Sequence, residues 1–98
     1  MDNMKEQYYI VRCDRAGVFA GNIKSRDGRE VVMTNARRLW YWEGAASLSQ
    51  LAVEGVKAPK RCKFTVTVPE VILLDAIEIT ACTDEAEDSI RGVPVWKM

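Results

Sequence analysis

The sequence predicts a small α+β domain that is mainly antiparallel sheet. Three observations support this fold class. Apolar and polar residues alternate in several segments, as they do in half-buried strands. Asp27-Gly28 stands between two apolar runs and is a strong β-hairpin signal. Two segments, 48–54 and 84–91, follow Ser47 and Thr83, which are favoured N-caps, and predict two short helices.

The first half of the chain reads as strands. Residues 8–13 are aromatic and β-branched and predict the first strand. Residues 17–24 and 29–42 form the two arms of the expected hairpin. The second arm is long for one strand, so we expect a bend or bulge near Thr34 and Asn35.

The length of the hairpin loop sets its register. A two-residue loop at Asp27-Gly28 places Ile23 opposite Val32. The same register opposes the like charges of Arg26 and Arg29, which argues for a longer loop.

The second half alternates strands and helices. Leu48, Leu51 and Ala52 share one face of the expected helix at 48–54. Residues 62–68 alternate and predict a half-buried strand, which Pro69-Glu70 is expected to turn. The segment that follows, from residue 71 to residue 82, is apolar enough for a central strand. We expect residues 1–98 to form one domain, with residues 1–6 flexible.

Composition excludes several functions. The 14 Lys and Arg residues balance the 14 Asp and Glu residues, which leaves no net field to attract nucleic acid or an anionic membrane. No segment is apolar over the length of a bilayer, and we expect neither a signal peptide nor a membrane partner. Zero net charge also permits self-association.

The sequence offers no constellation for catalysis. It contains no histidine, which excludes an imidazole base and a histidine-based zinc site. Asp75 and Glu78 lie three residues apart on an expected strand and therefore point to opposite faces. Cys13, Cys62 and Cys82 form no CxxC pair, so we expect buried, reduced thiols in a cytosolic protein. The sequence thus predicts a protein that is not an enzyme, with no catalytic residue, metal ligand or cofactor.

The segment TNARRLWYWEGAASLSQ, residues 34–50, carries the strongest binding signal. On a strand, Arg38, Trp40 and Trp42 share one face, while Arg37 and Tyr41 share the other. A guanidinium beside an indole suits planar, anionic groups such as nucleotides. The candidate ligand-binding residues are Arg37, Arg38, Trp40, Tyr41, Trp42, Gly44 and Ser47, the last two at the start of the helix. The alternative is a packed strand or a subunit interface.

The block RRLWYWEGAASLSQLA, residues 37–52, and the segments around it resemble a group of small uncharacterised proteins of tailed bacteriophages and prophages. The resemblance covers residues 9–96. It implies a viral protein made in the host bacterial cytoplasm. It carries over no established catalytic or binding residue.

A phage origin favours a particular class of function. We expect a non-enzymatic, homo-oligomeric binding module that counteracts host defence, by sequestering a nucleotide-like small molecule or by binding a host protein. One alternative is a structural or assembly component of the phage particle. A nucleic-acid-binding accessory protein is a weaker alternative, because the basic residues lack interleaved aromatics.

Overall fold

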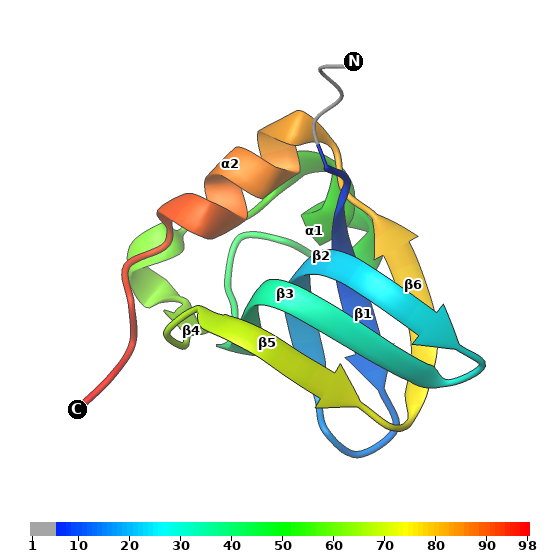
Figure 1. Ribbon diagram of the computed structural model, residues 1–98. Coiled ribbons are helices and arrows are strands. Elements are labelled where there is room, and N and C mark those ends of the chain that lie inside the picture. The colour runs from blue at the N-terminus through cyan, green and yellow to red at the C-terminus, as the bar shows by residue number, and fades with distance from the viewer. Residues whose placement is uncertain (1–5) are drawn as a thin grey trace.

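The computed structural model describes residues 6–98, and Figure 1 shows a curled sheet with two helices on one side. The strands are β1 (Tyr8–Cys13), β2 (Val18–Asp27), β3 (Glu30–Tyr41), β4 (Lys63–Phe64), β5 (Val68–Leu73) and β6 (Ala76–Ala81). The helices are α1 (Leu48–Glu54), α2 (Asp84–Gly92) and a short 3-10 helix, η1 (Pro59–Arg61). The α+β fold class is confirmed. Flexibility was expected for residues 1–6. Residues 1–5 lie outside the described residues, and Glu6 is exposed.

The sheet curls until its two edges approach each other. Its strands lie in the order β4-β3-β2-β1-β6, with β5 also beside β3, and all these pairs are antiparallel. β5 and β6 lie at opposite edges, yet only Leu74 and Asp75 separate them in the chain. Such a short connection requires the strong curl seen in Figure 1. The Ala76 N–H also donates to the Arg29 carbonyl at 3.0 Å, which ties the β2–β3 hairpin to the start of β6.

The curl separates two hydrophobic clusters. One consists of strand residues alone and includes Val11 and Met33. The other includes Ile10 together with Leu51 of α1 and Ile90 of α2. Ile10 and Val11 point to opposite faces of β1 and are 1% and 0% exposed, so β1 is buried on both sides.

Both helices begin where their caps predict. Ser47 Oγ accepts a hydrogen bond from the Gln50 N–H at 3.1 Å, and Thr83 Oγ1 accepts one from the Ala86 N–H at 3.0 Å. α1 has the predicted bounds, and α2 ends one residue later than predicted, at Gly92. Nowhere in residues 6–98 is a helix long and apolar enough to cross a membrane.

The β2–β3 hairpin is confirmed, with a turn one residue later than the Asp-Gly signal implies. Asp27 pairs with Glu30, so the loop residues are Gly28 and Arg29. Gly28 has a φ of 60°, the left-handed region that a tight hairpin turn requires at its first position.

The predicted pairing of Ile23 with Val32 is wrong. Ile23 pairs with Met33, and Val32 pairs with Ser25. The later turn moves the register, and an irregularity between Ile23 and Ser25 moves it again.

The single strand predicted over residues 62–68 is also wrong. β4 contains only Lys63–Phe64, and Val66 is exposed before the chain enters β5. Pro69 and Glu70, which were expected to turn the chain, lie inside β5. Proline is tolerated there because β5 is an edge strand whose one strand partner within residues 6–98 is β3.

Residues 71–82 do not form one central strand. Leu74 and Asp75 divide the segment between β5 and β6, and β6 lies at the sheet edge. Long-range bonds fix this break: the Asp75 carbonyl accepts from the Asp14 N–H at 3.0 Å, and Asp75 Oδ2 accepts from the Arg15 N–H at 2.8 Å.

Candidate functional site

A β-bulge in β3 decides which way each side chain of the arginine pair points. Ala20 pairs with Arg37 and Asn22 pairs with Thr34, so Asn35 and Ala36 together oppose Gly21. Asn35 has a φ of 50°, which a short polar side chain tolerates. The expected bulge near Thr34 and Asn35 is thus confirmed.

The bulge turns Arg37 toward the helices. Its side chain is 3% exposed. Nε donates to the Thr65 carbonyl, Nη2 to that of Phe64, and Nη1 to those of Ile90 and Val93, at 3.0–3.1 Å. Burial lowers the pKa of the Arg37 guanidinium from its ordinary value. Arg37 is therefore a structural clamp between the β3–β4 region and the end of α2.

Arg38 points to the opposite face and lines a groove. The groove has a volume of about 570 Å³. Its lining residues come from β3 and its continuation, from the loop between β1 and β2, and from the start of β2: Arg15, Ala16, Gly17, Val18, Arg38, Leu39, Trp40 and Trp42. The structure therefore brings Arg38, Trp40 and Trp42 together, as strand alternation predicts. We refer to this feature as the Arg-Trp groove.

Arg38 is held on an aromatic surface with its charge unneutralised. Its Cζ lies 4.6 Å from the centre of the Phe19 ring, a cation–π contact. Its backbone N–H donates to Thr65 Oγ1 at 3.0 Å. Among the described residues, no carboxylate lies within ion-pair distance of its guanidinium. Arg38 is thus positioned and still able to bind an anion.

The second cation of the groove, Arg15, was missed by the sequence reasoning. Two hydrogen bonds fix the loop that carries Arg15. The Cys13 N–H donates to the Gly17 carbonyl at 2.8 Å, and the backbone N–H of Arg15 donates to the Asp75 carboxylate. Its guanidinium likewise has no carboxylate partner within residues 6–98. Only the spatial pairing of distant segments reveals it, since nothing in the local sequence distinguishes this loop arginine.

Trp40 is the exposed aromatic of the groove, with 63% of its surface accessible. Its ring stacks on Trp96, with centroids 6.4 Å apart and planes inclined by 5°. Trp96 is fixed in turn. Its backbone N–H donates to the Phe64 carbonyl at 2.9 Å, and the Lys63 ammonium lies 5.5 Å from the centre of its ring. The C-terminal segment therefore supports Trp40 from outside the groove.

Tyr41, Gly44 and Ser47 lie outside the groove lining. Tyr41 hydroxyl donates to Glu43 at 2.6 Å, and this bond raises the tyrosine pKa. Gly44 permits a close chain approach: a Cβ there would lie 2.4 Å from the Lys57 nitrogen. Ser47 caps α1. These three residues have structural contacts.

The start of α1 is partly occupied by its own capping contacts. The Ala46 N–H already donates to Gln50 Oε1 at 2.7 Å, and the Gln50 N–H donates to Ser47. These capping contacts thus occupy two of the backbone donors near this end.

Burial suppresses the ionisation of three other groups. It raises the pKa of Tyr8 to about 12 and the pKa values of Cys13 and Cys82 to about 11. All three cysteines, including Cys62, are free and buried, as the sequence predicts. Cys13 and Cys82 therefore remain protonated at neutral pH and are poor nucleophiles.

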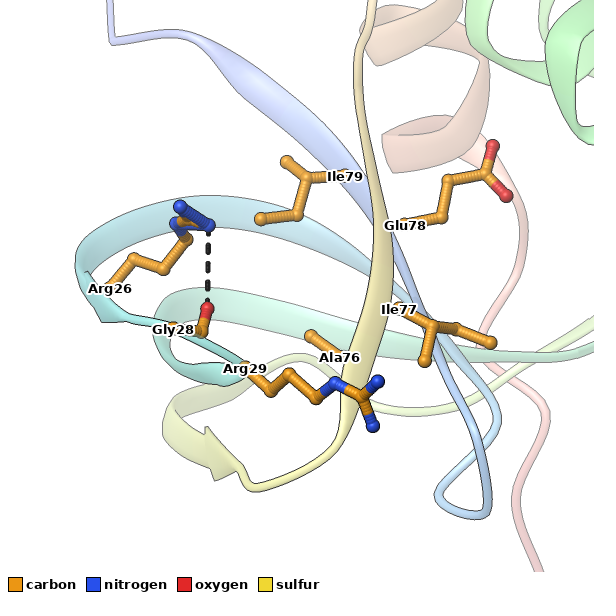
Figure 2. A pocket seen from close by; sticks show the side chains of 7 residues that line it. All are labelled: Arg26, Gly28, Arg29, Ala76, Ile77, Glu78 and Ile79. Carbon is orange, nitrogen blue, oxygen red and sulfur yellow. Dashed lines mark hydrogen bonds between the residues drawn. The ribbon is translucent and has the colours of Figure 1, made fainter.

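A second groove lies between the hairpin tip and β6, with a volume of about 450 Å³ (Figure 2). It contains Arg26 and Arg29 but no aromatic side chain. In Figure 2 the two arginines point in different directions, and Arg26 Nη1 donates to the Gly28 carbonyl at 3.3 Å. This groove therefore lacks the stacking surface and the converging charges that a planar anion requires.

Residues 6–90 match the family described as a domain of unknown function, DUF6948. The chain belongs to this family. The matched residues of the DUF6948 domain include Arg15, Arg38, Trp40 and Trp42, whereas Trp96 lies beyond them. No curated protein and no solved structure matches the chain.

The Arg-Trp groove of this DUF6948 domain combines two chemical features. Two guanidinium groups supply directed donors for phosphate or carboxylate oxygens. The exposed indole of Trp40 supplies a flat apolar face for stacking. A ligand that uses both must be planar at one end and anionic at the other.

Proposed function

We propose that this protein is a non-enzymatic binding module that holds a nucleotide-like small molecule in the Arg-Trp groove. One observation carries the proposal: Arg15 and Arg38, neither with a carboxylate partner among the described residues, share a groove with the exposed Trp40. An unneutralised guanidinium binds phosphate through directed, charge-assisted hydrogen bonds. A nucleobase stacks on an indole through its π face.

The resemblance to small phage proteins gives this binding a biological role. A phage protein that holds a nucleotide in the host cytoplasm removes it from host receptors, so we propose sequestration of a host defence signal. Binding needs no general base, in keeping with the lack of histidine in the sequence. The alternative of a virion component makes no specific use of the groove. A nucleic-acid-binding factor needs a wider basic surface than two arginines on a chain of zero net charge provide.

Isothermal titration calorimetry with AMP, ATP and cyclic di-GMP tests the proposal. We expect at least one of these probes to bind at a single site. Replacing Arg38 by serine removes a charged hydrogen bond of about 1.5–3 kcal/mol, which corresponds to a loss of affinity of roughly 10-fold or more. Trp40→Ala should also weaken binding by about 1–3 kcal/mol, and Trp40→Phe should weaken it less.

Lys60→Ser is the matched control, because Lys60 is an exposed cation outside the groove lining. It removes the same charge and should leave the affinity unchanged. The proposal fails if none of the three probes binds. It also fails if Lys60→Ser weakens binding as much as Arg38→Ser, since the effect would then be non-specific.

A further inference from the structure

The outer edge of β6 is an open sheet edge. β6 pairs with β1 on one side, and no other strand within residues 6–98 pairs with its other side. The Cys82 N–H donates to the Tyr8 carbonyl at 2.8 Å, toward β1. Because backbone groups alternate along a strand, those of Ala81 and Ile79 point to the opposite edge. They are available to pair with another strand.

The far half of β2 borders the same region. β1 pairs with β2 only from Val18 to Asn22, so Ile23–Asp27 has β3 as its one strand partner among the described residues. The hairpin tip then meets β6 through the Ala76 N–H bond to the Arg29 carbonyl. Beyond this link the tip and β6 separate and leave the groove of Figure 2. We call it the edge groove.

Two arginines flank the edge groove without a carboxylate partner in the described part of the chain. Figure 2 shows Arg26 curling back toward Gly28, while Arg29 reaches past Ala76. Glu78 points away from the hairpin and is held by Arg12 at 3.0 Å, so it does not neutralise them.

The two cations do not converge on one small ion, but they fit an extended chain. Successive side chains of a strand point to opposite faces, so two neighbouring acidic residues can reach two diverging arginines. Ile77, which is 43% exposed, adds apolar contact beside the edge. Two arginines beside an open strand edge favour an acidic partner.

We propose that the edge groove binds an extended, acidic segment of a partner protein, which adds to the free edge of β6 as a further strand. Main-chain hydrogen bonds to β6 supply affinity, and Arg26 and Arg29 supply the preference for acidic residues. This surface is separate from the Arg-Trp groove, and the proposal is independent of nucleotide binding.

The test is an NMR titration with a blocked hexapeptide, Thr-Val-Glu-Glu-Val-Thr, in which the adjacent glutamates face opposite sides. The expected result is a set of amide shift changes confined to residues 23–29 and 76–81. The peptide Thr-Val-Lys-Lys-Val-Thr should bind at least about fivefold more weakly, because its two charges repel the arginines where the glutamates attract them. Arg26→Ser with Arg29→Ser should weaken the glutamate peptide to the same extent.

Lys60→Ser with Lys97→Ser is the matched control, because it removes two charges from exposed residues outside the edge groove. This variant should bind the glutamate peptide normally. Unchanged amide spectra away from the substituted residues establish that both double variants are folded. The proposal is overturned by an absence of shift changes at β6, by equal binding of the lysine peptide, or by shifts confined to the Arg-Trp groove. Concentration-dependent shifts at β6 without peptide also overturn it, because they indicate pairing with a second copy.

Discussion

Arg37 Nη1 lies 3.0 Å from the carbonyl oxygen of Ile90, a residue 53 positions further along the chain. This bond joins β3 to the last turn of α2, where backbone carbonyls lack partners within the helix. A buried positive charge also suits the negative end of the helix dipole. The more buried member of the arginine pair therefore stabilises the fold, and Arg38 is the member that we propose for binding.

We expect Arg37→Met to destabilise the protein by roughly 3 kcal/mol or more, because several buried carbonyls lose a charged donor. Arg38→Met should cost less than about 1 kcal/mol, since that side chain is exposed. Urea unfolding measures both values. If Arg37→Met does not fold, Arg37→Lys should still fold, with a melting temperature below that of the wild-type protein. Equal effects of the Arg37→Met and Arg38→Met substitutions would contradict the division of roles.

The stack of Trp96 on Trp40 predicts an effect of the C-terminal segment on the groove. Trp96→Ala should weaken binding of the nucleotide probe a few-fold, because Trp40 then becomes more mobile. Trp96→Phe should preserve most of the affinity. The free energy of unfolding should change by less than about 1 kcal/mol, because Trp96 is a half-exposed residue of the C-terminal segment. Calorimetry and urea unfolding of the two variants check these values, and unchanged affinity of Trp96→Ala would disprove the supporting role.

Burial of ionisable groups predicts that stability falls in alkaline solution. The pKa of Tyr8 rises from 10.0 to about 12, and those of Cys13 and Cys82 rise from 9.0 to about 11. The unfolded chain therefore loses these protons at lower pH than the folded chain. Their contribution to stability is complete below pH 9 and is lost as the pH rises from 9 toward 12. Melting temperatures measured between pH 8 and 11 should stay nearly level up to about pH 9 and then fall. A constant or rising value above pH 9 would refute the assignment.

Exposed aromatic surface predicts self-association. Trp40, Tyr41 and Trp96 are 63%, 44% and 46% exposed, and a chain of zero net charge has little long-range repulsion. Analytical ultracentrifugation at micromolar concentration should detect a dimer or a larger oligomer. Tyr41→Ser with Trp96→Ser should sediment as a monomer. A monomeric wild-type protein would remove this prediction, and an oligomeric double variant would place the interface elsewhere.

Local signals in the sequence predicted most of the elements. Caps at Ser47 and Thr83 located both helices, and the Asp-Gly pair located the hairpin. The divisions among β4, β5 and β6 were missed because they depend on distant partners. Asp75, for example, ends a strand through bonds to Asp14 and Arg15 rather than through a turn residue of its own.

The candidate site shows the same limit. Alternation placed Arg38, Trp40 and Trp42 on one face, and the structure confirms that they share a groove. Alternation alone could not show which face of the strand is buried, because the hydrogen-bond partners of Arg37 lie 27 to 56 residues away in the chain. Nor could it find Arg15, which joins the groove through the pairing of β2 with β3.

The bulge that orients the arginines depends on the lack of a side chain at Gly21. A Cβ on Gly21 would lie 2.8 Å from Ala36 Cα and 2.9 Å from the Thr34 carbonyl oxygen, both backbone atoms of the bulged strand. Gly21→Ala must therefore displace the bulge, at a cost of about 1–3 kcal/mol. Gly92→Ala is the control, because open space surrounds Gly92.

Asn35 tests the same bulge from the other strand. Asn35→Gly should change stability by less than about 0.5 kcal/mol, because glycine adopts positive φ freely while the unfolded chain gains entropy. Asn35→Val should cost roughly 1–2 kcal/mol, because a β-branched residue is strained at a φ of 50°. Folded Gly21→Ala protein should also bind the nucleotide probe more weakly, because Arg38 follows the displaced backbone. Equal stability of Gly21→Ala and Gly92→Ala in urea unfolding would show that the bulge does not control this strand.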